Sequence, residues 1–579
     1  MSVRDRMGGT PRVFVRGHWS VEVRGDEIAD IRFDGVYLLR AIRPVVRDRD
    51  WNTAPVSVVS QRADDDGSTL VTGLLFEADD IRYEASVRLR LRGDELAVDF
   101  DGRALVAFER NRIGLVVLHP AADAGRAVRV KHTDGSRTDG SWPTEISPHQ
   151  PFRDVEGFEW STEGVTATLS LGGDIFETED QRNWTDASFK TYSTPLSLPF
   201  PVAVPAGATC HQHARLTVVG HGTGRPGTAS SETVTVSSMV AGTLPPISLG
   251  ACLYPPPAQP PKGADSYETV LVELTGDEGW WPEQLRSAAR QAEALGAGLD
   301  VRIVTADRAA VGRCVARLAG FPVVRLGAFD PDGHISTSTL WCALRDSARE
   351  HGFTGQLVGG TRAHFTELNR NIQRIPTDVP ALSFSITPQM HATEIPHLVD
   401  SLAIQRIVAE NARRLGGGRP VFVGPITLAR RFNAVATTAA PDPAVDAQRA
   451  IDPLQPTEFT GAWTLGSVTS LTAAGVTGVC YFETCGPRGI VGPDQALTPA
   501  GKVLDRLAQL RGRPVLHCAG PADIAALPVL LEDGSIELLI ANLSAKQRTI
   551  EVGGSGQRPV PVDFDGWSVH RTTLRAPSD

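Results

Sequence analysis

The sequence lacks the cysteine pattern of a disulfide-bonded protein. Its seven cysteines are an odd number, and none forms a C-x-x-C pair. This pattern suits a reducing compartment better than an oxidising one. Cys480 and Cys485 are the closest pair, but no second pair of zinc ligands accompanies them. We therefore expect a cytoplasmic protein with free cysteines.

Long apolar runs and an excess of basic residues are also missing. The first residues, Met1–Arg6, have no apolar core and do not resemble a signal peptide. No apolar stretch approaches the length of a membrane span. The net charge is −10 and the pI is near 5.8, whereas binding to nucleic acid phosphates needs a basic face. We expect neither a membrane nor nucleic acid as partner; an oligomer is compatible with the sequence.

Three catalytic motifs are absent. No G-x-S-x-G follows a strand-like segment, and there is no P-loop. No G-x-G-x-x-G follows the first strand of the central region. Nucleophilic serine chemistry, phosphoryl transfer and dinucleotide redox chemistry are therefore not supported, and we expect no organic cofactor.

One histidine pattern resembles a metal motif but departs from it. His391, Glu394 and His397 form H-x-x-E-x-x-H, whereas a zinc helix needs two histidines four residues apart. Pro396 also interrupts any helix at this point. We predict no metal site, and we interpret His391 as a proton-transfer or hydrogen-bonding residue. A buried, hydrogen-bonded structural histidine is the alternative.

The chain is long enough for several domains. It has 579 residues, of which 41% are hydrophobic and 21% charged, as in globular proteins. Apolar and polar residues alternate in segments such as Tyr83–Leu91 and Val165–Leu171, which is typical of half-buried antiparallel strands. We predict a β-sandwich domain over residues 1–245. A small antiparallel β domain is predicted over residues 513–579.

Between these β regions, short apolar strands alternate with helical segments. Eight strand–helix units predict a (β/α)8 TIM barrel over residues 246–512, with an open doubly wound sheet as the alternative. The predicted strands are Ile247–Cys252, Val270–Leu274, Val301–Thr305, Val323–Leu326, Gln356–Gly359, Ala381–Ile386, Val421–Val423 and Gly478–Phe482. The predicted helices include Pro282–Leu295, Ala309–Leu318, Leu340–Glu350 and Leu398–Leu415.

Barrel enzymes place their active sites at the C-terminal ends of the strands. Glu483 directly follows the eighth predicted strand, and Glu367 follows the fifth, among polar neighbours. Two carboxylates at a barrel mouth can divide acid and base roles, although each can instead form a rim salt bridge. We predict three catalytic residues: Glu367, Glu483 and His391. Further residues near strand ends are predicted to bind substrate: Glu273, Asn369, Arg370 and Gln389.

The segment from Glu179 to Tyr192 has neither a helical nor a strand period. Within fourteen residues it combines carboxylates, amides, two cations, hydroxyls and three aromatic side chains. Such a mixture suits a loop that binds a small polyhydroxylated molecule at the barrel mouth, with a solvated loop as the alternative. Four of its residues are predicted to bind substrate: Asp180, Asn183, Trp184 and Asp186.

Several of these segments resemble those of a known family, the D-apionate lactonases. The matching pieces are Asn111–Gly114, Leu118–Pro120, Pro148–Phe152, Glu179–Tyr192, Glu367–Arg370 and Pro388–Ala392. The resemblance implies a β-sandwich, a barrel and a small C-terminal β domain. It also implies hydrolysis of the lactone D-apionolactone to D-apionate in apiose catabolism.

Two alternatives remain open. The architecture also resembles glycoside hydrolases, which use two carboxylates. Their commonest retaining barrels carry Asn-Glu after the fourth strand and Glu after the seventh, whereas this chain has Gly327–Asp330 and Gly424–Thr427 there. A non-catalytic carbohydrate-binding protein needs aromatic platforms but no paired carboxylates. For a lactonase, we expect Glu367 or Glu483 to activate water, with the oxyanion stabilised by Arg370, Asn369 or His391.

Overall fold

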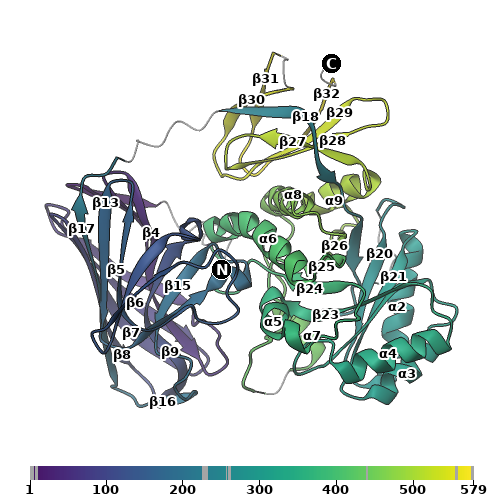
Figure 1. The fold of residues 1–579 in the computed structure, drawn as a ribbon, viewed down its shortest axis with the longest axis horizontal. Helices are drawn as coiled ribbons and strands as arrows, with labels where there is room; N and C mark the ends of the chain where they lie inside the picture. The colour runs from purple at the N-terminus through teal and green to yellow at the C-terminus, as the bar shows by residue number, and fades with distance from the viewer. Residues whose placement is uncertain are drawn as a thin grey trace. The chain divides into compact units, whose positions relative to one another are not determined.

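The computed structural model describes residues 6, 11–223, 232–255, 257, 263–438, 441–554 and 558–575. The chain divides into two compact units, which are described separately. The first comprises Met1–Arg182, Asp186–Thr228 and Val435–Ala440; the second comprises Asn183–Thr185, Ala229–Ala434 and Pro441–Asp579. Figure 1 shows the strands of the first unit and the barrel of the second. No helix of the described residues is long and apolar enough to cross a membrane.

The first unit consists mainly of strands, as predicted. They are β1 (Arg12–Arg16), β2 (Trp19–Arg24), β3 (Glu27–Phe33), β4 (Val36–Asp48), β5 (Val56–Ala63), β6 (Thr69–Ala78), β7 (Ile81–Arg92), β8 (Glu95–Ala104), β9 (Phe108–Pro120), β10 (Ala127–His132), β11 (Arg137–Ser141), β12 (Phe152–Thr162), β13 (Val165–Gly172), β14 (Phe176–Asp180), β15 (Ser188–Ser193), β16 (Val202–Val204) and β17 (Thr209–Gly220). Two short 3-10 helices, η1 (Ala121–Asp123) and η2 (Gln181–Trp184), interrupt the strand order.

Strand pairing folds these strands into two layers around one core. One run of neighbours is β5-β6-β7-β8-β17-β13-β12, and the other is β14-β15-β9-β4-β3-β2-β1. β12 joins the runs because it pairs with β13 and also with β14, the latter pairing containing a register shift between Phe152 and Val155. Trp19 and Phe33 of one run share a buried core with Phe100 and Leu216 of the other. The alternating sequence pattern therefore produces the sandwich.

The central region forms a closed barrel of eight parallel strands, as predicted. The strands are β19 (Ile247–Gly250), β20 (Thr269–Leu274), β21 (Gly298–Val304), β22 (Val323–Phe329), β23 (Gln356–His364), β24 (Leu382–Ile386), β25 (Val421–Ile426) and β26 (Gly478–Glu483). Each overlaps one strand predicted from the sequence. β23 differs most, since it continues for five residues beyond the predicted end at Gly359. The open-sheet alternative is excluded because β26 pairs with β19.

Helices follow the strands and cover the barrel (Figure 1). They are α2 (Trp281–Ala294), α3 (Arg308–Ala316), α4 (Ser338–Glu350), α5 (Phe365–Asn371), α6 (Ile395–Leu415), α7 (Pro443–Arg449), α8 (Glu458–Ala473) and α9 (Pro499–Gln509), with the 3-10 turns η3 (Glu278–Trp280) and η4 (Ile372–Arg374). Side chains at N-caps define several starts: Asp307 accepts a hydrogen bond from the Ala309 amide and Thr337 from the Leu340 amide.

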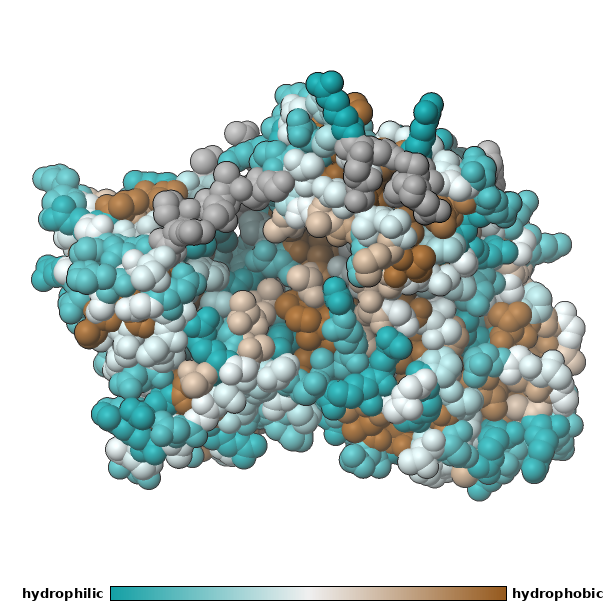
Figure 2. Space-filling model, turned by 45° about the horizontal axis from the view of Figure 1, so that its top comes forward, coloured by the Kyte–Doolittle hydropathy of each residue, from teal (hydrophilic) through white to brown (hydrophobic). Residues whose placement is uncertain are grey.

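The C-terminal region forms a seven-stranded sheet in the order β31-β30-β18-β27-β28-β29-β32. Its strands are β18 (Thr233–Thr243), β27 (Pro514–Ala519), β28 (Ile524–Leu530), β29 (Ile536–Asn542), β30 (Arg548–Gly554), β31 (Val560–Phe564) and β32 (Val569–Leu574). β18 lies within the predicted sandwich, residues 1–245, yet it pairs with β27 and, in parallel, with β30. Its Val234 and Val236 are fully buried in the core of this sheet, which explains the difference. Figure 2 shows hydrophobic residues scattered among hydrophilic ones on one face of the molecule.

Candidate functional site

Three carboxylates lie at the C-terminal ends of the barrel strands. Glu273 is the penultimate residue of β20, and Glu483 is the last residue of β26. Glu367 lies in the first turn of α5, directly after β23. All strands of the barrel are parallel, so these three residues belong to the same end of it.

Each of these carboxylates has one buried oxygen without a hydrogen-bond partner. The three atoms are Glu273 Oε1, Glu367 Oε2 and Glu483 Oε2, and they are the carboxylate oxygens of the described residues with this property. A buried polar atom without a partner is unfavourable by about 1–3 kcal/mol, and more for a charged group. Three such atoms at one end of a barrel are therefore typical of a site that binds or transforms a ligand.

Two arginines hold the other oxygen of Glu273. Arg362 Nη2 donates to Glu273 Oε2 at 2.7 Å, and Arg431 Nη1 donates to the same oxygen at 2.8 Å. Arg431 Nη2 also donates to the Arg362 carbonyl oxygen at 2.5 Å. Burial alone raises the pKa of Glu273, but the two guanidinium groups lower it well below its usual range. Glu273 is therefore ionised at neutral pH.

An aromatic ring and a neutral histidine accompany this ion-pair cluster. The guanidinium carbons of Arg362 and Arg431 lie 4.1 and 5.1 Å from the centroid of the Phe432 ring. The His334 ring lies 4.9 Å from Phe432. Burial, together with the charge of Arg362, lowers the pKa of His334 to about 4, so its imidazole is neutral at pH 7.

Glu367 combines a structural role with a shifted pKa. It occupies the third helical position after the N-cap His364, and the backbone N–H of His364 donates to its carboxylate. This is the reciprocal half of a capping box. Burial nevertheless raises the pKa of Glu367 to about 7, against the opposing effects of Arg370 and the backbone donors. A carboxyl group that titrates near neutrality suits proton transfer.

Glu483 is fixed through one oxygen. Arg488 Nε and Nη2 donate to Glu483 Oε1 at 3.0 and 2.7 Å. Burial raises the pKa of Glu483, whereas Arg488 and the weakly donating Cys252 thiol oppose this shift. The charge of Arg431 acts on Glu483, as it does on Glu273. Arg431 is therefore close enough to influence two of the three carboxylates.

Residues Asn183–Thr185, part of the loop predicted to bind substrate, belong to the barrel unit. Thr366 Oγ1 donates to the Asn183 carbonyl oxygen at 3.0 Å, and Asn369 Nδ2 donates to Asn183 Oδ1 at 2.9 Å. Thr185 Oγ1 donates to the Thr387 carbonyl oxygen at 3.1 Å. These bonds hold the three residues against the ends of β23 and β24.

The Trp184 ring packs among two histidines and an arginine. It lies 5.9 Å from both the His364 and His391 rings, and the Arg370 guanidinium lies 5.8 Å from its centroid. Burial lowers the pKa of His364 to about 3, so this histidine is neutral. Asn369 and Arg370, predicted to bind substrate, thus contact Asn183 and Trp184.

The other residues that were predicted to bind substrate form hydrogen bonds within the protein. Gln389 Nε2 donates to Asp452 Oδ2 at 2.6 Å. Asp180 belongs to the first unit, where Arg182 donates to both of its oxygens, from Nε at 2.8 Å and from Nη2 at 2.7 Å. Asp186 also belongs to the first unit, and its amide donates to the Gln181 carbonyl oxygen at 3.3 Å. Substrate contact by these residues stays a prediction.

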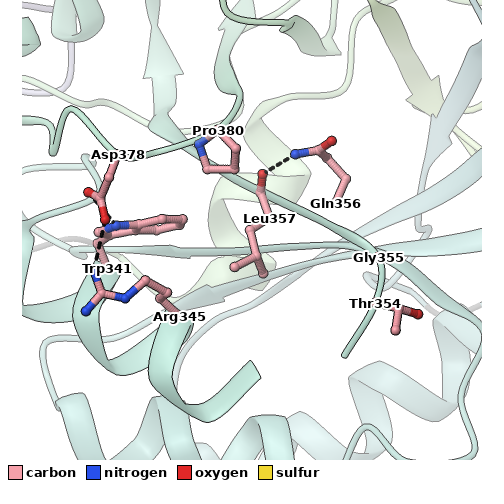
Figure 3. A pocket seen from close by; sticks show the side chains of 8 residues that line it. All are labelled: Trp341, Arg345, Thr354, Gly355, Gln356, Leu357, Asp378 and Pro380. Atoms are coloured by element: carbon pink, nitrogen blue, oxygen red, sulfur yellow. Dashed lines mark hydrogen bonds and ion pairs between the residues drawn. The ribbon is translucent and has the colours of Figure 1, made fainter. Parts of the chain in front are cut away.

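The described residues contain no group of three or more His, Cys, Asp or Glu side chains that could hold a metal ion. A cavity of about 400 Å³ lies at the opposite, N-terminal end of the barrel. Figure 3 shows its lining, in which Trp341 and Arg345 both point toward Asp378. Because buried polar groups with shifted pKa values mark functional sites better than an exposed hollow does, the candidate site is at the C-terminal end.

Sequence reasoning missed Arg362, Arg431, His334 and Phe432 as site residues. Arg362 lies in the part of β23 beyond its predicted end, and Arg431 lies in the long segment between β25 and α7. The available signal was that Arg362 lies near the C-terminal end of a barrel strand and Arg431 follows one, as site residues do. Nothing in their local sequence indicates that they meet at Glu273.

Comparison with known proteins agrees with the strand-rich N-terminal domain and the barrel. Residues 3–221 match the family model of the D-apionate lactonase N-terminal domain, and residues 266–512 match that of the D-apionate lactonase TIM barrel domain. The chain belongs to the D-apionate lactonase family. It is 27% identical over 516 residues to the D-apionate lactonase of Brucella anthropi, covering 84% of each chain. This membership makes the protein an enzyme of the hydrolase class.

Two solved structures show a distant likeness to this chain. The GH51 arabinofuranosidase from Xanthomonas axonopodis pv. citri shares 11% identity and a TM-score of 0.38, covering 59% of this chain and 97% of the other. SrfJ from Salmonella typhimurium shares 8% identity and a TM-score of 0.39, covering 66% and 98%. At these scores neither likeness supports a functional assignment.

Proposed function

We propose that this protein hydrolyses D-apionolactone to D-apionate at the C-terminal end of its barrel. The observation that carries the proposal is the set of three buried carboxylates with one unpartnered oxygen each, in a chain of the D-apionate lactonase family. Opening a lactone needs a base for water and an acid for the leaving oxygen, and the three carboxylates differ in ways that suit separate roles.

Glu367 is the proposed general base. Its pKa of about 7 leaves a large fraction ionised at neutral pH, and its free oxygen can accept a proton from water. Water then attacks the ring carbonyl carbon, and the carbonyl oxygen gains negative charge. Because the single negative charge of Glu273 balances only one of the two neighbouring guanidinium charges, positive charge remains at Arg431 that can stabilise this oxyanion.

Glu483 is the proposed general acid. Burial raises its pKa, which favours the protonated form that a proton donor needs. It gives its proton to the ring oxygen as the carbonyl carbon–oxygen bond breaks, and the products are the hydroxyl group and carboxylate of the open sugar acid. His391, beside Trp184, is the alternative donor.

Product analysis tests this proposal. Purified protein should open D-apionolactone, with D-apionate appearing by NMR faster than in the buffer alone, and should leave a panel of aryl glycosides intact. Cleavage of a glycoside without lactone opening would replace the proposal by the glycosidase alternative. Binding of sugars without turnover of either class would favour the non-catalytic alternative.

A further inference from the structure

We infer that Glu273 and Arg362 form a hydroxyl-binding subsite that selects lactones carrying free hydroxyl groups over plain lactones. This inference rests on the proposed lactone hydrolysis and adds to it the two residues that recognise the hydroxyl groups of the substrate. Neither of these two residues is the proposed base or the proposed acid.

The evidence is a pair of unpartnered atoms within one ion pair. Glu273 Oε1 and Arg362 Nε are both buried and have no hydrogen-bond partner. The two side chains are joined through Glu273 Oε2 and Arg362 Nη2 at 2.7 Å, and each is only 10% exposed. The two unpartnered atoms therefore lie close together, and leaving both without partners is unfavourable.

The chemistry of these atoms narrows the choice of ligand group. An ionised carboxylate only accepts hydrogen bonds, and a guanidinium only donates them. A carbonyl group could satisfy Arg362 but not Glu273, whereas an ammonium group could satisfy Glu273 but not Arg362. A hydroxyl both donates and accepts, so one hydroxyl, or two on adjacent carbons, satisfies both atoms.

The surroundings fix the pair in place. Arg431 donates to the same Glu273 oxygen as Arg362 does, and Phe432 packs against both guanidinium groups. His334 Nδ1 lies 3.4 Å from Arg362 Nη1. With these contacts, the carboxylate and guanidinium have little freedom to turn toward each other, and an incoming hydroxyl meets a preorganised site.

The test compares kcat/KM for D-apionolactone with kcat/KM for γ-butyrolactone, whose ring carries no hydroxyl. Glu273→Gln removes the charged acceptor, and Arg362→Lys keeps the positive charge but removes the Nε donor. For each variant, the preference for D-apionolactone should fall by roughly 10- to 100-fold, because a hydrogen bond to a charged group is lost. Asp378→Asn, at the other end of the barrel, is the matched control and should keep the wild-type preference.

The outcomes distinguish failure of the subsite from failure of the proposed hydrolase function. An equal loss on both lactones, or an unchanged preference in both variants, overturns the subsite. If Glu273→Gln does not fold, Arg362→Lys alone decides. If the wild type opens neither lactone, calorimetric titration with D-apionolactone separates the cases: binding that weakens in Arg362→Lys supports the subsite without the hydrolase function, and absence of binding overturns the subsite as well.

Discussion

The two ends of the barrel differ in what they bury. At the N-terminal end, the cavity of about 400 Å³ is lined by groups that satisfy one another: Trp341 Nε1 and Arg345 Nη1 donate to the two oxygens of Asp378 at 2.8 and 2.9 Å. The Arg345 and Asp378 side chains are about half exposed, at 46% and 52%. At the C-terminal end, by contrast, Glu273 and Arg362 are each 10% exposed and both have unpartnered atoms.

This difference shows that a surface cavity and a site with catalytic chemistry can lie at different ends of the same barrel. Solvent screens the exposed ion pair at the N-terminal end, so its contribution to stability is small. Burial at the C-terminal end removes that screening and raises the pKa values of Glu367 and Glu483, whereas Arg362 and Arg431 lower that of Glu273. Such divergent shifts let carboxylates perform different steps of one reaction.

The largest expected effect comes from the proposed acid and base. Glu367→Gln and Glu483→Gln should each lower kcat for D-apionolactone by about 100- to 10,000-fold, since a positioned acid or base contributes that much. Circular dichroism should show that both variants remain folded. Near-normal turnover in both variants would contradict the placement of the active site at the C-terminal end of the barrel.

The buried ion pairs inside the barrel should govern stability rather than chemistry. Asp300 accepts hydrogen bonds from Arg302 and Arg325, and the Asp300 and Arg302 side chains are each 1% exposed. Asp300→Leu leaves two buried guanidinium groups without their common partner, which should lower the free energy of unfolding by about 3–5 kcal/mol. Urea denaturation measures the loss; a loss below about 1 kcal/mol would contradict this view of the barrel interior.

Glu367 should also make stability depend on pH. Its pKa is raised by burial from 4.5 to about 7 in the folded protein, so the folded state binds more protons between these values. Stability from this group is therefore complete below about pH 4.5 and is lost as the pH rises to 7, by on the order of 3 kcal/mol. The unfolding free energy of Glu367→Gln, measured across this range, should lack this part of the slope that the wild type shows.

The smallest effect is expected at the N-terminal end. Asp378→Asn weakens the exposed pair with Arg345 and should change the free energy of unfolding by no more than about 1 kcal/mol. Its kcat/KM for D-apionolactone should equal that of the wild type. A large loss of activity in this variant would assign a functional role to the cavity in Figure 3.

More of the fold than of the candidate site could be predicted from the sequence. All eight barrel strands were predicted because each is a short apolar run, and Glu273, Glu367 and Glu483 could be placed at strand ends from that pattern alone. The pairing of β18 with β27 and β30 was missed because it joins segments on either side of the barrel sequence. Arg362 and Arg431 were missed because they are far from Glu273 in the sequence and meet it only when the barrel closes.

The pH dependence of kcat/KM for lactone opening tests the central claim most directly. If Glu367 is the base, the wild-type rate should rise with pH along a limb with a midpoint near 7, as the carboxyl group loses its proton. The residual activity of Glu367→Gln should lack that limb, while Asp378→Asn should keep it. A limb with the same midpoint in Glu367→Gln would contradict the account, because another group would then be the base.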